Sequence, residues 1–443
     1  MRKYSHDIVV RVRIPHRPGQ LAQLAAVLAE QGALLGDITT HHLGEHDTVR
    51  DLTVEANDEA HVARVADAIR GIGGVELISV SDKVFERHRG GKLHAGARVP
   101  VTSVADLRYI YTPGVARVSR AIERDPTLAW EYTGVGNSVG IFTNGTRVLG
   151  LGDVGPLASL PVMEGKAVLY DQFAGISATP LLVDTKDAEV FIDTVVLLAK
   201  TFGGIHLEDI RVPECFRIED ELIRRLDKPV MHDDQHGTAT VALAALLNAC
   251  AMTGVDPRSS RVGQIGLGAA GSAIARIALA YGAKDVLVTD VSPHAVKRMT
   301  AMGAVASDMD TILRECHIVV ATTGRPGLIP PEKVRAGQVI FALSNPDPEI
   351  APDVALAAGA AFAGDGRSIN NALAYPGIFK GALSVRARAI TPAMLLAAAE
   401  AIAARAPKGE LVPSPFNPHV HASVRDAVAG RARIEGLANT AKV

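Results

Sequence analysis

The N-terminal end of the chain shows two successive hydrophobic periods. Between residues 7 and 14 apolar side chains recur at every second position, which is typical of a strand with one buried face; they are Ile8, Val10, Val12 and Ile14. A turn at Pro18 and Gly19 follows. The next apolar positions, Leu21, Leu24 and Leu28, recur at intervals of three and four, which predicts a helix.

The same alternation of periods continues to about residue 82. Strands are predicted at about 34–42, around 52–54 and at 75–80, with a second helix at 62–69 before the last strand. The resulting order is β-α-β-β-α-β, which is the ferredoxin-like arrangement. Residues 1–82 are therefore expected to form one small domain.

Beyond this domain the composition changes twice. The stretch 83–98 is polar and basic and is predicted to be a linker. From residue 99 strands and helices are predicted in the α/β manner, with parallel strands. We divide this part into a first α/β domain (99–250), a second α/β domain of Rossmann type (251–395) and a C-terminal helical segment (396–443).

A glycine-rich turn opens the second α/β domain. It follows a predicted strand at 261–265 and precedes a predicted helix at 272–281; its residues are Gly266, Gly268, Ala269, Ala270 and Gly271. A G-x-G-x-x-G pattern alone is weak evidence, but a strand before it and a helix after it are the context of dinucleotide binding. The pyrophosphate of NAD is expected at the helix N-terminus.

The choice between NAD and NADP depends on the end of the next strand. Asp290 lies there, about 20 residues after the turn, where a carboxylate accepts a bond from a ribose hydroxyl and repels a 2′-phosphate. NAD is therefore predicted, although Lys297 and Arg298 would favour NADP if they folded over the site. Thr322 and Asn345, at the ends of later strands, are assigned to the same cofactor site.

Paired carboxylates follow two apolar runs in the first α/β domain. Glu208 and Asp209 come after the run 204–207, and Asp233 and Asp234 come shortly after the run 229–231. Parallel strands present such ends at one edge of a sheet, so these carboxylates are expected to converge. Oxygen ligands select Mg²⁺ or Mn²⁺ over zinc. The alternative is that each pair caps the helix that follows it.

Overall composition narrows the function classes. The 443 residues exceed one ordinary core, and 46 basic against 48 acidic residues indicate neither a nucleic-acid nor a membrane partner, so a small soluble ligand is expected. Three dispersed cysteines indicate neither disulfides nor a zinc site, which favours a reducing cytoplasm. The longest apolar tract, 239–252, is predicted to be a buried helix because it is shorter than a membrane span.

Several motifs, taken in order, resemble malic enzymes of the short bacterial type over about residues 83–400. They are Tyr-Thr-Pro-Gly-Val-Ala at 111–116, Leu-Gly-Leu-Gly-Asp at 149–153, Glu-Gly-Lys at 164–166, Leu-Glu-Asp at 207–209, His-Asp-Asp-Gln-His-Gly-Thr at 232–238, Ser-Asn-Pro at 344–346 and Asn-Asn-Ala at 370–372. The resemblance implies metal-dependent oxidative decarboxylation of L-malate to pyruvate and CO₂, with reduction of NAD(P)⁺.

The same resemblance implies roles for particular residues. Lys166 would be the base that takes the hydroxyl proton, held by Asp233 and with its pKa lowered by burial and neighbouring cations. The metal would bind to Glu208, Asp209 and Asp234.

Further roles concern protonation and substrate binding. Tyr111, expected in a strand and facing a cleft, would protonate the enolate. Arg147, Asn345 and Asn371 would hold a malate carboxylate. Tyr111 and Arg147 also have ordinary structural explanations, a buried aromatic ring with a satisfied hydroxyl for Tyr111 and a surface ion pair for Arg147.

The N-terminal domain resembles an ACT domain, a regulatory module that commonly pairs with a copy of itself. The resemblance implies a homodimer and an amino acid or other metabolite as effector at the Pro18-Gly19 turn. A structural module without ligand is the alternative. Malolactic conversion or oxaloacetate decarboxylation would suit the same fold, and an amino-acid-sensing protein with an inactive dehydrogenase body is a further alternative.

Overall fold

The computed structural model describes residues 6–148 and 150–439. The chain divides into two compact units, with the boundary between His94 and Ala95. Leu149, the first residue of the Leu-Gly-Leu-Gly-Asp motif, lies outside the described residues.

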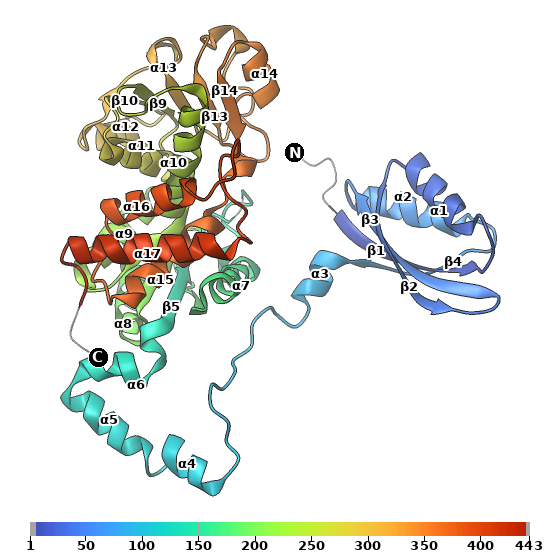
Figure 1. Cartoon of the computed structure of the whole chain (residues 1–443), viewed down its shortest axis with the longest axis horizontal. Helices are drawn as coiled ribbons and strands as arrows, with labels where there is room; N and C mark the ends of the chain where they lie inside the picture. The colour runs from blue at the N-terminus through green and yellow to red at the C-terminus, as the bar shows by residue number, and fades with distance from the viewer. Residues whose placement is uncertain (1–5, 149, 440–443) are drawn as a thin grey trace. The chain divides into compact units, whose positions relative to one another are not determined.

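The N-terminal unit has the order of elements that the sequence predicts. They are β1 (His6–Pro15), α1 (Gln20–Glu30), β2 (Leu34–Leu43), β3 (Asp47–Ala56), α2 (Glu59–Arg70) and β4 (Glu76–Asp82). The antiparallel sheet has the strand order β2-β3-β1-β4, and in Figure 1 both helices lie along one face of it. The alternating residues of β1 and the leucines of α1 form the buried core between these layers.

The predicted linker begins with a helix that its polar, basic composition did not indicate, and the boundary between the two units lies within this linker. Asp82 ends β4, and its carboxylate accepts hydrogen bonds from the backbone N–H groups of Val84 and Phe85. This cap starts α3 (Lys83–His88). A single capping residue thus makes a local helix in a stretch whose overall composition is that of a linker.

The strand predicted around Tyr111 is wrong, because α4 (Val104–Ile110) and α5 (Val115–Arg124) occupy this region. The hydroxyl of Ser103 accepts a bond from the N–H of Asp106 and so caps α4. Val104, Leu107 and Ile110 then follow at helical spacing. Neither helix has a buried residue.

The next part of the second unit is built on a parallel sheet in the order β6-β5-β7-β8. Its strands are β5 (Ser138–Thr143), β6 (Ser177–Leu182), β7 (Gly204–Leu207) and β8 (Val230–His232). The associated helices are α6 (Ala129–Tyr132), α7 (Gly155–Ala174), α8 (Ala188–Leu198) and α9 (Glu214–Arg225). β7 and β8 are adjacent, which brings their carboxyl ends together.

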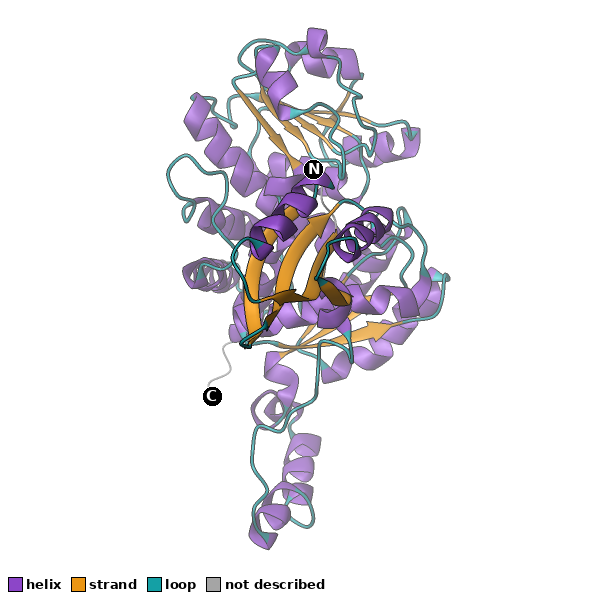
Figure 2. Cartoon of the chain, turned by 90° about the vertical axis from the view of Figure 1, so that its right-hand side faces the viewer, coloured by secondary structure: helices purple, strands orange, loops and turns teal. Residues whose placement is uncertain are grey.

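A six-stranded parallel sheet follows, in the order β11-β10-β9-β12-β13-β14. The strands are β9 (Arg261–Ile265), β10 (Asp285–Thr289), β11 (Val305–Ala306), β12 (Ile318–Ala321), β13 (Val339–Ala342) and β14 (Phe362–Asp365). The helices are α11 (Ala269–Tyr281), α12 (Pro293–Thr300), α13 (Met309–Glu315) and α14 (Pro352–Ala357). Figure 2 shows the strands of this doubly wound sheet with helices around them.

One long helix, α10 (Asp233–Thr253), connects the two parallel sheets and packs against α11 and α16 (Pro392–Ala403). It is long and apolar enough to cross a membrane, but 61% of its most apolar window is buried inside the protein. It is therefore better explained as a core helix. α15 (Tyr375–Ser384) and α17 (Pro418–Ile434) complete the C-terminal packing.

Candidate active site

The two pairs of carboxylates meet at the ends of β7 and β8. Leu207 and His232 are paired in register, so Glu208 and Asp209 leave the sheet beside Asp233 and Asp234, which begin α10. Glu208, Asp209 and Asp234 each offer an oxygen, and these oxygens lie within 4.8 Å of one another. The convergence expected from the sequence is present.

The electrostatics of this group suit a divalent cation. Burial, reinforced by the charge of Asp234, raises the pKa of Glu208 to about 7, and burial together with the negative charges of Glu208 and Asp234 raises the pKa of Asp209 to about 8. One buried oxygen of Asp209, Oδ2, has no hydrogen-bond partner among the described residues. A hard cation would relieve the repulsion and satisfy this oxygen, so the residues fit Mg²⁺ or Mn²⁺.

The backbone of Asp209 is held in an uncommon conformation. Its φ is 51°, in the left-handed region that few residues other than glycine adopt. Its N–H donates to Oδ2 of Asp234 at 2.9 Å, and its carbonyl accepts from the N–H of Arg147 at 3.0 Å. These two bonds offset the strain and fix the carboxylate beside Asp234.

Lys166 comes from the middle of α7 and is largely buried. Its Nζ lies 2.6 Å from Oδ2 of Asp233 and 3.1 Å from Oε1 of Glu208, and 4.8 Å from the centre of the Tyr375 ring. The expected lowering of its pKa is contradicted. Burial by itself lowers the pKa of Lys166, but the carboxylates of Asp233 and Glu208 outweigh that effect and hold it well above its usual value. The neighbours are anions, not the cations that were expected.

Gly237 leaves the space that Asp233, the ion-pair partner of Lys166, occupies. A Cβ on Gly237 would overlap the carboxylate of Asp233 and come within 3.4 Å of Asn371. Only a residue without a side chain therefore leaves room for Asp233 in the first turn of α10. This explains the glycine of the His-Gly-Thr sequence in the motif.

Sequence reasoning missed a buried aromatic and histidine group behind Glu208. The Nε2 of His206 lies 2.7 Å from Oε2 of Glu208, and its Nδ1 lies 2.8 Å from the hydroxyl of Tyr170. Tyr375 packs edge-on against both rings. Burial lowers the pKa of His206 to about 3, so this side chain is neutral. The available signal was a histidine inside the otherwise apolar run 204–207.

One cavity joins these groups to the glycine-rich turn. It has a volume of about 400 Å³ and contains Lys166, the three clustered carboxylates and the turn; its lining includes Arg147, Lys166, Glu208, Asp209, Asp234, Gly268, Ala269, Ala270, Gly271, Thr322 and Asn371. A second cavity, of about 390 Å³, is lined by Gly266, Gly268, Asp290 and Thr322. Gly268, Thr322 and Arg147 line both, so the two cavities adjoin.

The carboxylate of Asp290 is bound to the backbone of this region. It accepts hydrogen bonds from the N–H of Leu267 at 2.6 Å and from the N–H of Ser292 at 2.7 Å. Arg298 points elsewhere, because its guanidinium stacks on the ring of Phe216 at 3.8 Å and donates to Ser272. Neither Arg298 nor Lys297 lines the cavity beside Asp290.

Three of the expected site residues line neither cavity; one of them, Asp233, is nevertheless in contact with Lys166. Tyr111 has a relative exposure of 69% and is not part of either lining. Asn345 is exposed and is likewise absent from both linings. Arg147 and Asn371 do line the cavity that contains Lys166.

Comparison with known proteins covers most of the chain. The family model for the malic enzyme N-terminal domain matches residues 97–190, and that for the malic enzyme NAD-binding domain matches residues 363–430. Residues 232–325 match the NAD-binding domain of D-isomer specific 2-hydroxyacid dehydrogenases.

Individual relatives agree with these matches. NAD-dependent malic enzyme 1 of Bacillus subtilis (strain 168) is 50% identical over 419 residues, which are 94% of this chain and 95% of that protein. The bifunctional malic/malolactic enzyme of the same organism is 39% identical over 82% of this chain and 95% of its own length. The crystal structure of malic enzyme from Pyrococcus horikoshii superposes with a TM-score of 0.77 at 41% identity, covering 82% of this chain and 92% of that one.

The match to the first of these relatives extends into the N-terminal unit, because 94% of the chain cannot be aligned without most of residues 1–94. The fold, the ordered motifs and the identities therefore lead to one conclusion: the chain belongs to the malic enzyme family.

Proposed function

We propose that this protein catalyses the oxidative decarboxylation of L-malate to pyruvate and CO₂ with reduction of NAD⁺. The supporting observation is the single cavity that contains Lys166, the three clustered carboxylates and the glycine-rich turn. A hydride acceptor must act on C2 of malate while a base and an electrophile act on its C2 oxygen, and the proposal is supported by a cavity that the candidate residues for all three line.

Glu208, Asp209 and Asp234 would hold the divalent cation, which when bound polarises the C2 oxygen and stabilises charge during loss of the C4 carboxylate. Lys166 takes the proton of the C2 hydroxyl, and Asp233 positions it at 2.6 Å. Because Asp233 and Glu208 favour the charged lysine, Lys166 becomes a base only when positive charge nearby offsets them. Arg147 and Asn371 offer donors to a malate carboxylate.

A binding protein with an inactive dehydrogenase body is the alternative of another class. The full chain is expected to reduce NAD⁺ steadily when L-malate and Mn²⁺ are supplied, which absorbance of NADH measures. Binding of NAD⁺ without any turnover would support the alternative.

A cytoplasmic location is part of this proposal. It is supported by the three cysteines, which are all free and buried.

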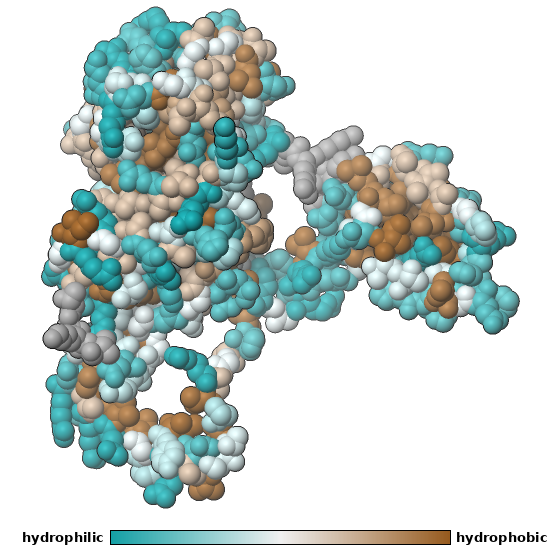
Figure 3. Space-filling model, in the orientation of Figure 1, coloured by the Kyte–Doolittle hydropathy of each residue, from teal (hydrophilic) through white to brown (hydrophobic). Residues whose placement is uncertain are grey.

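The general acid is proposed to come from a second copy of the chain. Tyr111 does not line the cavity of its own chain, and α4 and α5 around it expose apolar side chains; these are Val104, Leu107, Tyr109, Ile110, Val115 and Val118. Figure 3 shows hydrophobic atoms at the surface of this segment. An exposed apolar face of this kind marks an interface. A homodimer would cover it and bring Tyr111 to the partner's site.

Mixing two inactive variants tests this arrangement. Tyr111→Phe and Lys166→Ala are each expected to have little activity, but co-expressed chains should recover about a quarter of wild-type activity, because half of random dimers are mixed and each mixed dimer has one intact site. Activity of the purified mixture is the measurement. If Tyr111 acted within its own chain, no mixed dimer would have an intact site and the mixture would stay inactive.

Cofactor preference is proposed to be NAD. Asp290 lines the cavity next to the turn, and its carboxylate would repel a 2′-phosphate. Lys297 and Arg298 do not line that cavity, whereas Arg147 and Arg325 do, so the preference rests on the position of Asp290. We expect kcat/KM for NAD⁺ to exceed that for NADP⁺, and Asp290→Ser to narrow the difference. A higher kcat/KM for NADP⁺ in the wild type would refute the preference.

The N-terminal unit is proposed to be a ferredoxin-like, ACT-like effector domain. Gly19 turns the chain with a φ of 91°, and no side chain among the described residues caps the N-terminus of α1, so its N–H groups are available to the carboxylate of an amino acid.

A truncated chain tests the effector domain. We expect at least one amino acid or central metabolite to change the initial rate of the full chain, and a chain starting at Lys83 to lose that response while keeping its basal turnover. Identical responses of both chains would reduce the unit to a structural role.

A further inference from the structure

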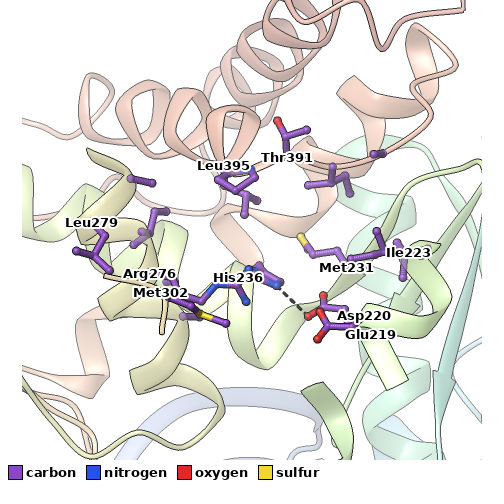
Figure 4. Close-up of a pocket in the computed structure, with 18 residues that line it drawn as sticks. Glu219, Asp220, Ile223, Met231, His236, Arg276, Leu279, Met302, Thr391 and Leu395 are labelled. Atoms are coloured by element: carbon purple, nitrogen blue, oxygen red, sulfur yellow. Dashed lines mark hydrogen bonds and ion pairs between the residues drawn. The ribbon is translucent and has the colours of Figure 1, made fainter. Parts of the chain in front are cut away.

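A third cavity lies behind the proposed active site, on the other side of α10. Its volume is about 570 Å³. Asp234 and Thr238 of α10 face the cavity of Lys166, whereas His236 and Ala239 face this one. No residue lines both. The walls come from α9, α10, α11 and the start of α16, as Figure 4 shows.

The walls of this cavity are mostly apolar and carry two unpaired charges. The apolar part includes Ile223, Met231, Ile277, Leu279, Met302 and Leu395. Asp220 of α9 and Arg276 of α11 also line it, and neither side chain makes a hydrogen bond or ion pair with any described residue. Asp220 is exposed and Arg276 half-buried, so both side chains keep polar atoms free to bind a ligand in the cavity.

The arrangement of the charges defines the ligand. In Figure 4 Arg276 lies on the side of Met302 and Leu279, and Asp220 lies near Ile223 and Met231. A dicarboxylate would be repelled by Asp220 and the buried Glu219, and a simple cation would be repelled by Arg276. A molecule with one carboxylate, one ammonium group and an apolar body matches the positive charge of Arg276, the negative charge of Asp220 and the apolar wall of the cavity.

We propose that this cavity binds a zwitterionic amino acid with an apolar side chain, its carboxylate on Arg276 and its ammonium group on Asp220. The apolar side chain occupies the space between Met231 and Leu395. This site is separate from the turn before α1 in the N-terminal unit, and it belongs to the part of the chain that carries the catalytic residues.

The cavity is connected to the segment that carries Asp234. Glu219, buried in the wall, accepts hydrogen bonds from the backbone N–H of His232 at 2.7 Å, from Nε2 of Gln235 at 2.8 Å and from Nε2 of His236 at 3.0 Å. His232 in turn lies 3.0 Å from Oδ2 of Asp234. An occupant that contacts His236 therefore acts on the same short segment that carries a candidate metal ligand.

Calorimetry on the full chain tests the proposal, with L-leucine, L-methionine and L-phenylalanine as probes. At least one should bind saturably, while N-acetyl-L-methionine and succinate, which lack the ammonium group or add a second carboxylate, should bind at least about tenfold more weakly. Arg276→Gln and Asp220→Asn should each weaken binding by a similar factor.

Two controls separate this site from others. Arg314→Gln and Asp193→Asn change exposed side chains outside the cavity and should leave binding unchanged. Ala280→Trp, which places a large side chain in the cavity wall, should abolish it. The proposal is overturned if none of the three probes binds, or if binding survives Arg276→Gln and Ala280→Trp unchanged, which would place the ligand elsewhere, such as at the N-terminal unit.

Discussion

Lys166→Ala is expected to lower kcat for malate oxidation by about 10²-fold to 10⁴-fold, the usual contribution of a general base. Lys166 is the only lysine in the lining of the cavity that contains the three carboxylates, as far as the described residues show. Initial rates of NADH formation at saturating malate and Mn²⁺ provide the measurement. KM for NAD⁺ should change little, because the cofactor residues are untouched.

Two comparisons make this result specific to the proton transfer. Lys186 forms an ion pair with Asp153 at the surface, with 66% of its side chain exposed, and Lys186→Ala should retain near-normal kcat. Removal of Lys166 also leaves Asp233 and Glu208 without their counter-charge, so NAD⁺ binding by the variant must be checked to show that it is folded. A folded Lys166→Ala protein with normal kcat would remove Lys166 from the role of base.

The second large effect concerns the metal. A chelator should abolish activity, and Mn²⁺ or Mg²⁺ should restore it, because Glu208, Asp209 and Asp234 repel one another without a cation. Asp234→Asn should raise the Mn²⁺ concentration for half-maximal rate by roughly tenfold or more, since a neutral ligand replaces a charged one. Asp193→Asn, at an exposed ion pair, is the control. Full turnover in chelator would contradict the metal assignment.

The same carboxylates predict how stability depends on pH in the absence of metal. The folded-state pKa values of Glu208 and Asp209, about 7 and about 8, lie above their unfolded values, so the folded protein holds protons that the unfolded chain releases. This contribution is present at low pH and is lost as pH rises from about 4 to about 8. Thermal unfolding of chelator-treated protein should therefore show a falling Tm over this range, and Mn²⁺ should reverse the fall.

The parts of the site that follow from local patterns were predictable from the sequence. Short apolar runs that end in Glu208 and Asp209, and in Asp233 and Asp234, predict two parallel strand ends, and the register of β7 and β8 places them side by side. The glycine-rich turn was predictable for the same reason, because its strand and helix are contiguous with it in sequence.

Features that depend on tertiary neighbours were not predictable. The pKa of Lys166 depends on which charges fold against it, and both prove to be carboxylates. The helix before Tyr111 begins at a cap formed by Ser103. In the sequence, the apolar residues near the Thr-Pro-Gly turn favoured a strand, and the cap was not recognised. The cavity between α9 and α11 was not predictable because no sequence motif marks it. Asp220 and Arg276 are 56 residues apart and line one cavity only through the packing of α10.

The most direct test of the proposed chemistry is the stoichiometry of a single reaction. Full-length protein is incubated with L-malate, NAD⁺ and Mn²⁺, and NADH, pyruvate and CO₂ are measured in the same sample. The proposed function predicts that the three products form in equal amounts and that the Lys166→Ala variant forms them about 10²-fold to 10⁴-fold more slowly. Lactate and CO₂ without net NADH would instead indicate malolactic conversion, and would contradict the proposal that the hydride leaves the site on the cofactor.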